Sequence, residues 1–309
     1  MKRFLLKRLL ALIPVLLGVS VVTFALINLT PGDPAEIAIR ASGVQPTSEA
    51  VEAMRQKLGL EGPVYRQYIR WLWKVIHLDL GQSFNSGLPV AQELLLRFPA
   101  TLRLALCALA FTAVIALPLG IFAAIYPGSP IDHISRVCAL LGSSMPGFWL
   151  GLLLIYALAV RLKLFPVVGM GGIKHLVLPA FTLGFGLAAP YIRLLKTSML
   201  EVLQKDFINT ARAKGLRERL VIARHALKNA LLPAVTLLGM NFGGLLSGSF
   251  IVETIFSWPG IGKYAVDAIF LKDYTVIQGY VLLMAVIFVL VNLLVDLCYV
   301  FLDPRIRLS

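Results

Sequence analysis

The sequence predicts an all-α membrane protein with six transmembrane helices, and three observations carry this prediction. Of the 309 residues, 58% are hydrophobic and only 15% are charged, whereas soluble domains carry about 25% charged residues. The mean hydropathy is +0.83. Six stretches lack Asp, Glu, Lys, Arg and His. Each is long enough to be a candidate span, because about 20 apolar residues of helix cross a bilayer. They are Leu9–Gly32, Leu104–Ile131, Val137–Val160, Leu176–Ile192, Asn229–Val252 and Tyr274–Val295. Such a composition excludes an ordinary soluble enzyme and a disordered chain.

The first stretch is expected to be an uncleaved anchor helix over residues 1–30. Four basic residues precede it, as in a signal peptide, but the stretch is longer than the hydrophobic region of a signal peptide and lacks a small-residue cleavage site before Pro31. Basic residues beside a span stay in the cytoplasm, so the N-terminus is expected there. Six crossings then return the C-terminal tail, residues 303–309, to the same side.

Residues 31–98 are expected to form a small helical insertion outside the cytoplasm. Apolar periodicity predicts helices over Ser48–Leu58 and Val64–Leu78, the first with Ser48 as N-cap and Gly59 as its end. Trp71 and Trp73 suggest packing at headgroup depth. A lid packed on its own helices is favoured over a direct substrate contact.

Residues 99–302 are expected to form a five-helix core, with Leu176–Ile192 as its shortest span. The segment Arg193–Lys228 carries nine basic residues against Glu201, Asp206 and Glu218, which places it in the cytoplasm. The net charge of +13 therefore follows from topology and predicts no nucleic-acid partner. Three basic residues are expected on the outer side of the membrane, which mildly violates the positive-inside rule: Arg161, Lys163 and Lys174.

Within the core, residues 197–229 divide at Gly215 into two expected helices, Ser198–Lys214 and Arg217–Asn229. Leu203, Phe207 and Ala211 recur at four-residue spacing and predict an apolar face on the first helix. Periodicity leaves two interpretations open. The basic amphipathic helix would lie on anionic lipid, or it would dock a partner.

Specific motifs in this segment resemble a known family. The stretches Asp206–Leu216 (DFINTARAKGL) and His225–Pro233 (HALKNALLP) resemble the cytoplasmic signature loop of permease subunits of ATP-binding-cassette importers, in the dipeptide, oligopeptide and nickel branch. Thr30–Pro34, Phe256–Gly262 and Leu302–Arg305 match the same branch. Asn209-Thr-Ala stands where the general motif has Glu-Ala-Ala, and the gap from Gly215 to Leu232-Pro233 is longer, as is typical of this branch.

The resemblance implies a coupling helix that sits in a groove of a separate ATPase. Its site residues would be Asp206, Thr210, Ala211, Arg212, Ala213, Lys214, Gly215 and Leu216. The expected partners are a homologous second permease, two ATPase subunits that bind ATP and Mg, an extracytoplasmic substrate-binding protein and the lipid bilayer. The expected location is the inner membrane of a bacterial or archaeal cell, and transport would proceed by alternating access.

Missing motifs agree with a transport subunit that is not an enzyme. The chain has no Gly-x4-Gly-Lys-Ser/Thr loop for nucleotide phosphates, and the six stretches carry no carboxylate or histidine for ion coupling. They also lack an intramembrane protease pattern. The four histidines have no companion ligand at helical spacing, so no metal site and no bound cofactor are expected.

The path and the substrate are less determined by the sequence. Prolines at 14, 118, 146 and 190 and the Gly239–Gly248 run are typical of close helix packing or of hinges. The family implies that the fifth helix borders the path, with Asn241 and Ser247 as lining candidates. The compact Arg161–His175 loop favours nickel or a nickel chelate, with dipeptides close behind. A stand-alone secondary carrier or channel is the alternative.

Overall fold

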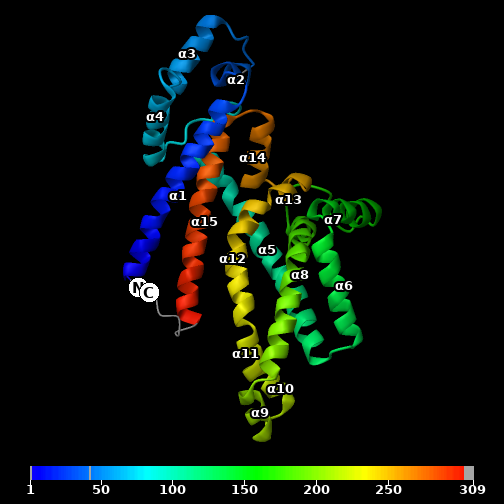
Figure 1. Cartoon of the computed structure of the whole chain (residues 1–309). Coiled ribbons are helices and arrows are strands. Elements are labelled where there is room, and N and C mark those ends of the chain that lie inside the picture. Colours follow the sequence, from blue (N-terminus) through cyan, green and yellow to red (C-terminus); the bar gives the residue numbers. More distant parts are fainter. Residues whose placement is uncertain (1, 42, 303–309) are drawn as a thin grey trace. The chain divides into compact units, whose positions relative to one another are not determined.

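The computed structural model describes residues 2–41 and 43–302, which form helices joined by short loops (Figure 1). Strand-like pairing in this part of the chain is one isolated bridge between Gln82 and Pro89. Five helices have the length and apolarity to cross a membrane, and a bent pair would make a sixth. The predicted all-α membrane class is confirmed. The expected tail, 303–309, lies outside the described residues.

The chain forms two compact units, each with its own packing. The first contains the described residues up to Ala100 together with Pro259–Leu293, and the second contains Thr101–Trp258 with the described residues from Leu294 to Leu302. The division expected from the sequence, after residues 30, 98 and 302, stays a prediction.

In the first unit, the anchor helix is followed by three short helices that build the expected insertion. Their bounds are α1 Lys2–Leu29, α2 Pro34–Ala41, α3 Ser48–Leu58 and α4 Val64–Ile76. Helix α3 has its predicted bounds, but Thr47 is its N-cap, with a side chain that accepts a hydrogen bond from Ala50 N. Gly59 ends α3 with φ +74°, a conformation in which glycine has little steric cost.

Helices at the other end of the chain complete this unit. These are α14, Ile261–Phe270, and the first part of α15, Tyr274–Leu302. Asp273 precedes α15 and is buried, and it accepts hydrogen bonds from the Ser83 hydroxyl at 2.6 Å and from Val276 N. This contact ties the loop before α5 to the start of the last helix. Neither α2 nor α14 was predicted.

The second unit contains the long helices of the core. It comprises the rest of α5 Val90–Ile125, α6 Pro130–Ser144, α7 Gly147–Leu154, η1 Ile155–Arg161, α8 Ile173–Leu203, α9 Asp206–Ala213, α10 Glu218–Leu220, η2 Val221–Ala226, α11 Leu227–Ala230, α12 Leu232–Gly248 and α13 Phe250–Ile255. Helix α8 has 31 residues and runs well past Ile192, where its apolar stretch ends.

The third predicted span is not one straight helix. Helices α6 and α7 meet at an angle of 107°. Met145 is extended, with φ −85° and ψ 125°, and Pro146 caps α7. A residue before proline is pushed out of the helical region, so Pro146 breaks the helix instead of lying inside it. The segment is a broken span or a re-entrant loop.

Small residues let α8 pack closely against its neighbours. A Cβ atom at Gly184 would lie 2.6 Å from the Ala108 carbonyl oxygen of α5, and one at Gly142 of α6 would lie 3.0 Å from the Phe185 carbonyl oxygen. Ala188, Ala189 and other small residues line the same core, which also buries Tyr191 and Ile192. Close backbone approach of this kind is how membrane helices associate.

Candidate functional site

The 197–229 segment lies at the C-terminal end of α8, where α9, α10 and α11 gather (Figure 1). The predicted single helix Ser198–Lys214 is wrong, because α8 ends at Leu203 and α9 begins at Asp206. Lys205 is extended, with φ −75° and ψ 147°, and interrupts the helical hydrogen bonding. The two-residue break allows α9 to follow a new direction.

Two side chains hold α9 against the core. Ile208 is fully buried and Ala211 nearly so, and they pack in one apolar cluster with Met199, Val221 and Ala226. The predicted apolar face, Leu203, Phe207 and Ala211, is therefore only partly right. Phe207 is 45% exposed, and Ile208 takes the place expected for it. Periodicity missed this because the break at Lys205 changes the register between Leu203 and Ala211.

The turn after α9 is built by a glycine and an ion pair. Gly215 has φ +77°, so the predicted role of glycine in permitting the bend agrees with its left-handed backbone. Across the turn, Arg212 donates two hydrogen bonds to Glu218, with Nη2–Oε1 at 2.7 Å and Nε–Oε2 at 3.1 Å. These bonds raise the pKa of Arg212 above its ordinary value. Arg212 is thus engaged within the segment.

The opposite side of α9 is open to contact. Asp206, Phe207, Thr210, Ala213 and Lys214 are exposed. Beyond the turn, Leu220 is 42% exposed and Leu216 packs partly into the core. The exposed surface of the segment thus combines the apolar side chains of Phe207 and Leu220 with basic residues around them. We call Phe207, Thr210, Ala213 and Lys214 the α9 outer face.

A buried carboxylate lies near this segment and was missed by sequence reasoning. Asp132 of α6 is 4% exposed and contacts Lys196 Nζ of α8 at 2.5 Å. Arg136 lies 3.3 Å away, and Gly128 N donates to the same carboxylate. The pair ties the turn between α5 and α6 to α8, seven residues before α8 ends. An acidic residue next to a predicted loop gave no signal of this long-range contact.

The two lining candidates are both on α12, but their settings differ. The Asn241 side-chain amide donates a hydrogen bond to the Tyr191 hydroxyl of α8 at 3.3 Å. Ser247 is exposed and donates to the Gly244 carbonyl oxygen. Met240, Gly244, Ser247 and Ile251 follow helical spacing and are all exposed, so they share an open face. Asn241 is directed partly into the bundle, and Ser247 is not.

A second carboxylate is buried just beyond the fifth apolar stretch. Glu253 is fully buried, and its Oε1 accepts hydrogen bonds from the hydroxyls of Thr101 at 2.7 Å and Ser249 at 3.0 Å. The fifth apolar stretch of the sequence ends at Val252 because Glu253 is ionisable, but in the structure the helix continues to Ile255. The site joins α5 to α13 within the second unit.

The first unit holds a cavity of about 480 Å³ that is lined by both apolar and charged side chains. Glu93 and Arg97 form an ion pair there, and the Arg97 guanidinium lies 4.3 Å from the centre of the Tyr264 ring. Burial is the main cause that raises the pKa of Tyr264. The lining residues are Ser83, Asn85, Ser86, Glu93, Arg97, Tyr264, Asp267, Ala268, Phe270, Leu271, Asp273 and Val276. Sequence reasoning did not predict this cavity, because its walls come from distant parts of the chain.

The sequence matches known families over most of its length. Residues 116–308 match the family described as binding-protein-dependent transport system inner membrane component, and residues 1–105 match the N-terminal part of such membrane components. The sequence is 42% identical to the dipeptide transport system permease protein DppB of Escherichia coli K12 over 338 positions. It is 43% identical to the glutathione transport system permease protein GsiC of Pectobacterium atrosepticum over 307 positions. Each alignment covers 99% of both chains.

Solved structures give an independent comparison of the fold. A chain of the MetNI methionine ABC transporter, in an inward-facing conformation, superimposes with a TM-score of 0.56 at 20% sequence identity. The match covers 69% of this chain and 97% of that chain. At this identity, the likeness concerns the fold alone.

Proposed function

Because the chain belongs to the family of binding-protein-dependent transport system inner membrane components, and is therefore the permease subunit of an importer, we propose that its α9 outer face couples it to a separate ATPase. Its relatives are transport subunits and not enzymes, and the chain is a multi-pass protein of the inner membrane. This membership removes the support for a stand-alone carrier or channel.

The proposed assembly contains this chain, a homologous second permease, two ATPase subunits and an extracytoplasmic binding protein. ATP and Mg would be bound by the ATPases, since the sequence has no phosphate-binding loop of its own. Closure of the ATPases would move α9, and α8 would transmit that movement into the bundle by alternating access. Asn241 and Ser247 stay lining candidates, with Ser247 on the more open face.

The observation that carries the coupling proposal is the two-sided build of α9. Ile208 and Ala211 fix the helix to the core, Thr210 and Ala213 are exposed on its other side, and Phe207 is 45% exposed at the edge between the two sides. An exposed aromatic on a short, anchored helix is typical of an interface anchor that fills a pocket on a partner. Anchoring on the inner side would let a push on α9 reach α8.

The test uses exposed residues outside the apolar cluster that holds Ile208 and Ala211. Phe207→Ala and Ala213→Glu are each expected to lower ATP-driven uptake more than about tenfold. The first truncates an interface anchor, which costs about 2 kcal/mol of binding, and the second places an unpaired carboxylate in the interface. Uptake and ATPase activity would be measured on the assembled transporter in vesicles. Lys228→Ala, which removes an exposed charge on α11, is the matched control and should leave both unchanged.

Arg212 is a poor test residue, because its charge reversal would place two carboxylates across the turn and disrupt the segment itself. Assembly of the variants is checked by co-purification of the ATPases. Normal uptake by both Phe207→Ala and Ala213→Glu would refute the coupling assignment. Loss of ATPase subunits on purification, with intact membrane insertion, would support it further.

For the substrate, we propose small peptides such as dipeptides or glutathione. The named relatives at 42% and 43% identity transport these molecules. The glutathione relative aligns over 307 positions, almost the length of this chain, whereas the dipeptide relative needs 338. Nickel or a nickel chelate, which the short Arg161–His175 loop favoured, becomes the second candidate. Titration of the cognate binding protein with glutathione, a dipeptide and nickel would decide among them.

A further inference from the structure

Helix α4 has an apolar stripe that stays open in the described structure. Tyr65, Ile69, Trp73 and Ile76 follow each other at helical spacing, and we call them the α4 apolar stripe. Ile69 is 60% exposed, and Trp73 is 66% exposed. Four large apolar side chains on one face of a 13-residue helix would be costly to leave in water. The stripe therefore needs an apolar environment outside the described chain.

A basic stripe runs beside the apolar one. Arg66, Arg70 and Lys74 are spaced by four residues and are exposed, and α4 contains no Asp or Glu. Successive residues of a helix turn by about 100°, so this stripe borders the apolar stripe along the whole helix. Adjacent apolar and basic stripes with Trp and Tyr are typical of helices that lie in a membrane interface.

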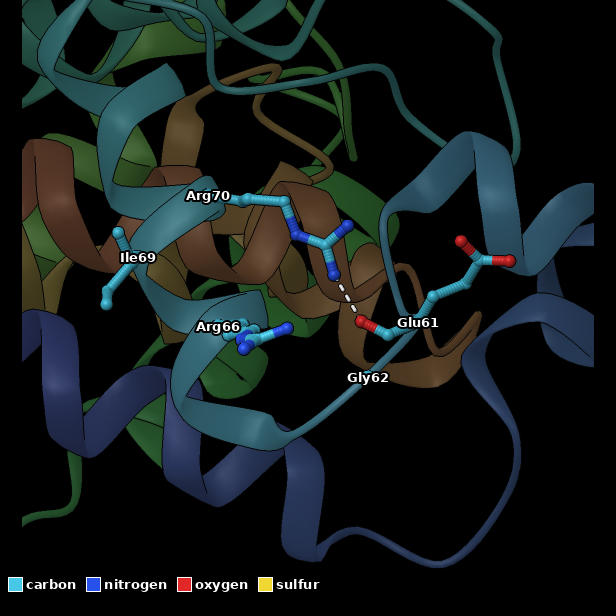
Figure 2. A pocket seen from close by; sticks show the side chains of 5 residues that line it. All are labelled: Glu61, Gly62, Arg66, Ile69 and Arg70. Atoms are coloured by element: carbon cyan, nitrogen blue, oxygen red, sulfur yellow. Dashed lines mark hydrogen bonds between the residues drawn. The ribbon is translucent and has the colours of Figure 1, made fainter.

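Two of these arginines line a hollow on the surface. A cavity of about 450 Å³ is lined by Glu61, Gly62, Arg66, Ile69 and Arg70 (Figure 2). Arg70 donates a hydrogen bond to the Glu61 carbonyl oxygen, and the Glu61 carboxylate is directed away from both guanidinium groups. The polar wall of the hollow is thus cationic, and Ile69 supplies its apolar wall. A phosphate on an acyl-bearing molecule fits both walls.

The third side of α4 fixes its depth relative to a membrane span. Figure 1 shows α4 beside the C-terminal half of α1, and the Tyr68 hydroxyl is 2.8 Å from the Ser20 hydroxyl. Phe24 packs on both Tyr68 and Trp71, with ring centres 5.4 and 5.6 Å apart. Phe24 and Ser20 precede Leu29, the end of the apolar span, by five and nine residues, which is about 7.5 and 13.5 Å of helix. Interfacial helices insert to about 5–10 Å.

We propose that α4 is an interfacial helix of the leaflet at the Leu29 end of α1. Its apolar stripe lies among the upper acyl chains, and Arg66 and Arg70 bind the phosphate groups of anionic phospholipids. Lys74 adds to the attraction of the negative surface. The insertion is thereby held against the membrane beside the first span. This assignment does not depend on the proposed function of α9.

The first arm of the test measures depth in the full chain. Nitroxide labels are placed at Ile69→Cys, Trp73→Cys and, as control, Lys57→Cys on the exposed surface of α3, after replacement of the three native cysteines. In lipid nanodiscs, labels at 69 and 73 should be more accessible to oxygen than to a water-soluble nickel chelate. The label at 57 should show the reverse. Chelate access at 69 and 73 equal to that at 57 would overturn the proposal, because the stripe would then lie in water. Shielding from both reagents would overturn it in favour of a protein partner.

The second arm measures the headgroup. Hydrogen exchange over residues 64–76 is compared between nanodiscs of phosphatidylcholine alone and of equal phosphatidylcholine and phosphatidylglycerol. Exchange should be slower with phosphatidylglycerol, and this difference should shrink about fivefold for each charge removed in Arg66→Gln and Arg66→Gln/Arg70→Gln. Lys57→Gln is the matched control and should keep the full difference. Equal exchange in both lipids, or an equal effect of inorganic phosphate added to phosphatidylcholine discs, would overturn headgroup binding.

Discussion

At the scale of single residues, the contact between Asp132 and Lys196 is a polar interaction that joins α6 to α8. The carboxylate has little exposed surface, and it receives the Lys196 ammonium, the Arg136 guanidinium and the Gly128 amide. Burial of a charge is tolerated only when its partners stay in place. Loss of the lysine would leave Asp132 with Arg136, which lies farther away and is more exposed to solvent.

Lys196→Ala is therefore expected to lower the free energy of unfolding by about 2–3 kcal/mol, somewhat below the cost for a fully buried pair, because Lys196 is partly exposed. Unfolding of the detergent-solubilised chain with heat or SDS would measure it. Arg136→Ala serves as the comparison and should cost about 1 kcal/mol or less, since exposed pairs contribute little. Equal losses in the two variants would contradict this ranking.

At the scale of helices, α8 depends on the close approach of its neighbours. Gly184 faces the backbone of α5 at Ala108 and the Phe111 side chain, whereas a Cβ atom at Gly186 would meet nothing within 4 Å. The two glycines lie two residues apart in one helix, so they differ in packing and not in secondary structure. They form a matched pair for testing the interface.

Gly184→Ala is expected to destabilise the chain by about 1–3 kcal/mol, because a methyl group against a fixed backbone carbonyl forces the helices apart. Gly186→Ala should be neutral or stabilising by up to about 1 kcal/mol, because alanine is the better helix former. The midpoint of thermal unfolding in detergent reports both changes. A larger loss for Gly186→Ala would mean that α8 packs differently from the structure.

Helix positions could be predicted where composition alone decides them. The apolar stretches located the long helices, and glycine marked the ends of α3 and α9 correctly, because local backbone chemistry sets both. The bend at Pro146, the break at Lys205 and the burial of Ile208 in place of Phe207 were missed. The bend follows from the local effect of Pro146 on Met145, which the apolar composition of the stretch concealed, whereas the burial of Ile208 depends on which distant helices pack against α9. The Asp132 and Glu253 contacts were missed for the same reason, since they join residues 64 and 152 positions apart.

At the scale of the whole molecule, the broken segment from α6 to η1 decides the number of crossings. Between Lys57 and Lys214 the chain passes through α5, this bent segment and α8. Three crossings place the two lysines on opposite sides of the membrane, and two crossings place them on the same side. The cytoplasmic location expected for both termini also requires six spans in all.

We expect Lys57→Cys and Lys214→Cys to react from opposite sides, as the positive-inside rule predicts for the basic segment around α9. A membrane-impermeant maleimide applied to intact cells should label position 57 and reach position 214 only after permeabilisation. Both positions are exposed, so access is not limited by burial. Labelling of both from outside would make α6 and α7 a re-entrant loop and leave five spans.

The two-residue break between α8 and α9 has a consequence for chain length among relatives. One inserted residue would turn everything that follows by about 100°, and Ile208 would leave the pocket formed with Met199 and Val221. Relatives should therefore have no insertion or deletion between the positions of Met199 and Gly215, even where their residues differ from those of this chain. The alignment with the dipeptide permease has 338 positions against 309 residues here, an excess of 29. Those additional residues should lie in loops such as 162–172, where no following helix depends on a fixed rotational phase.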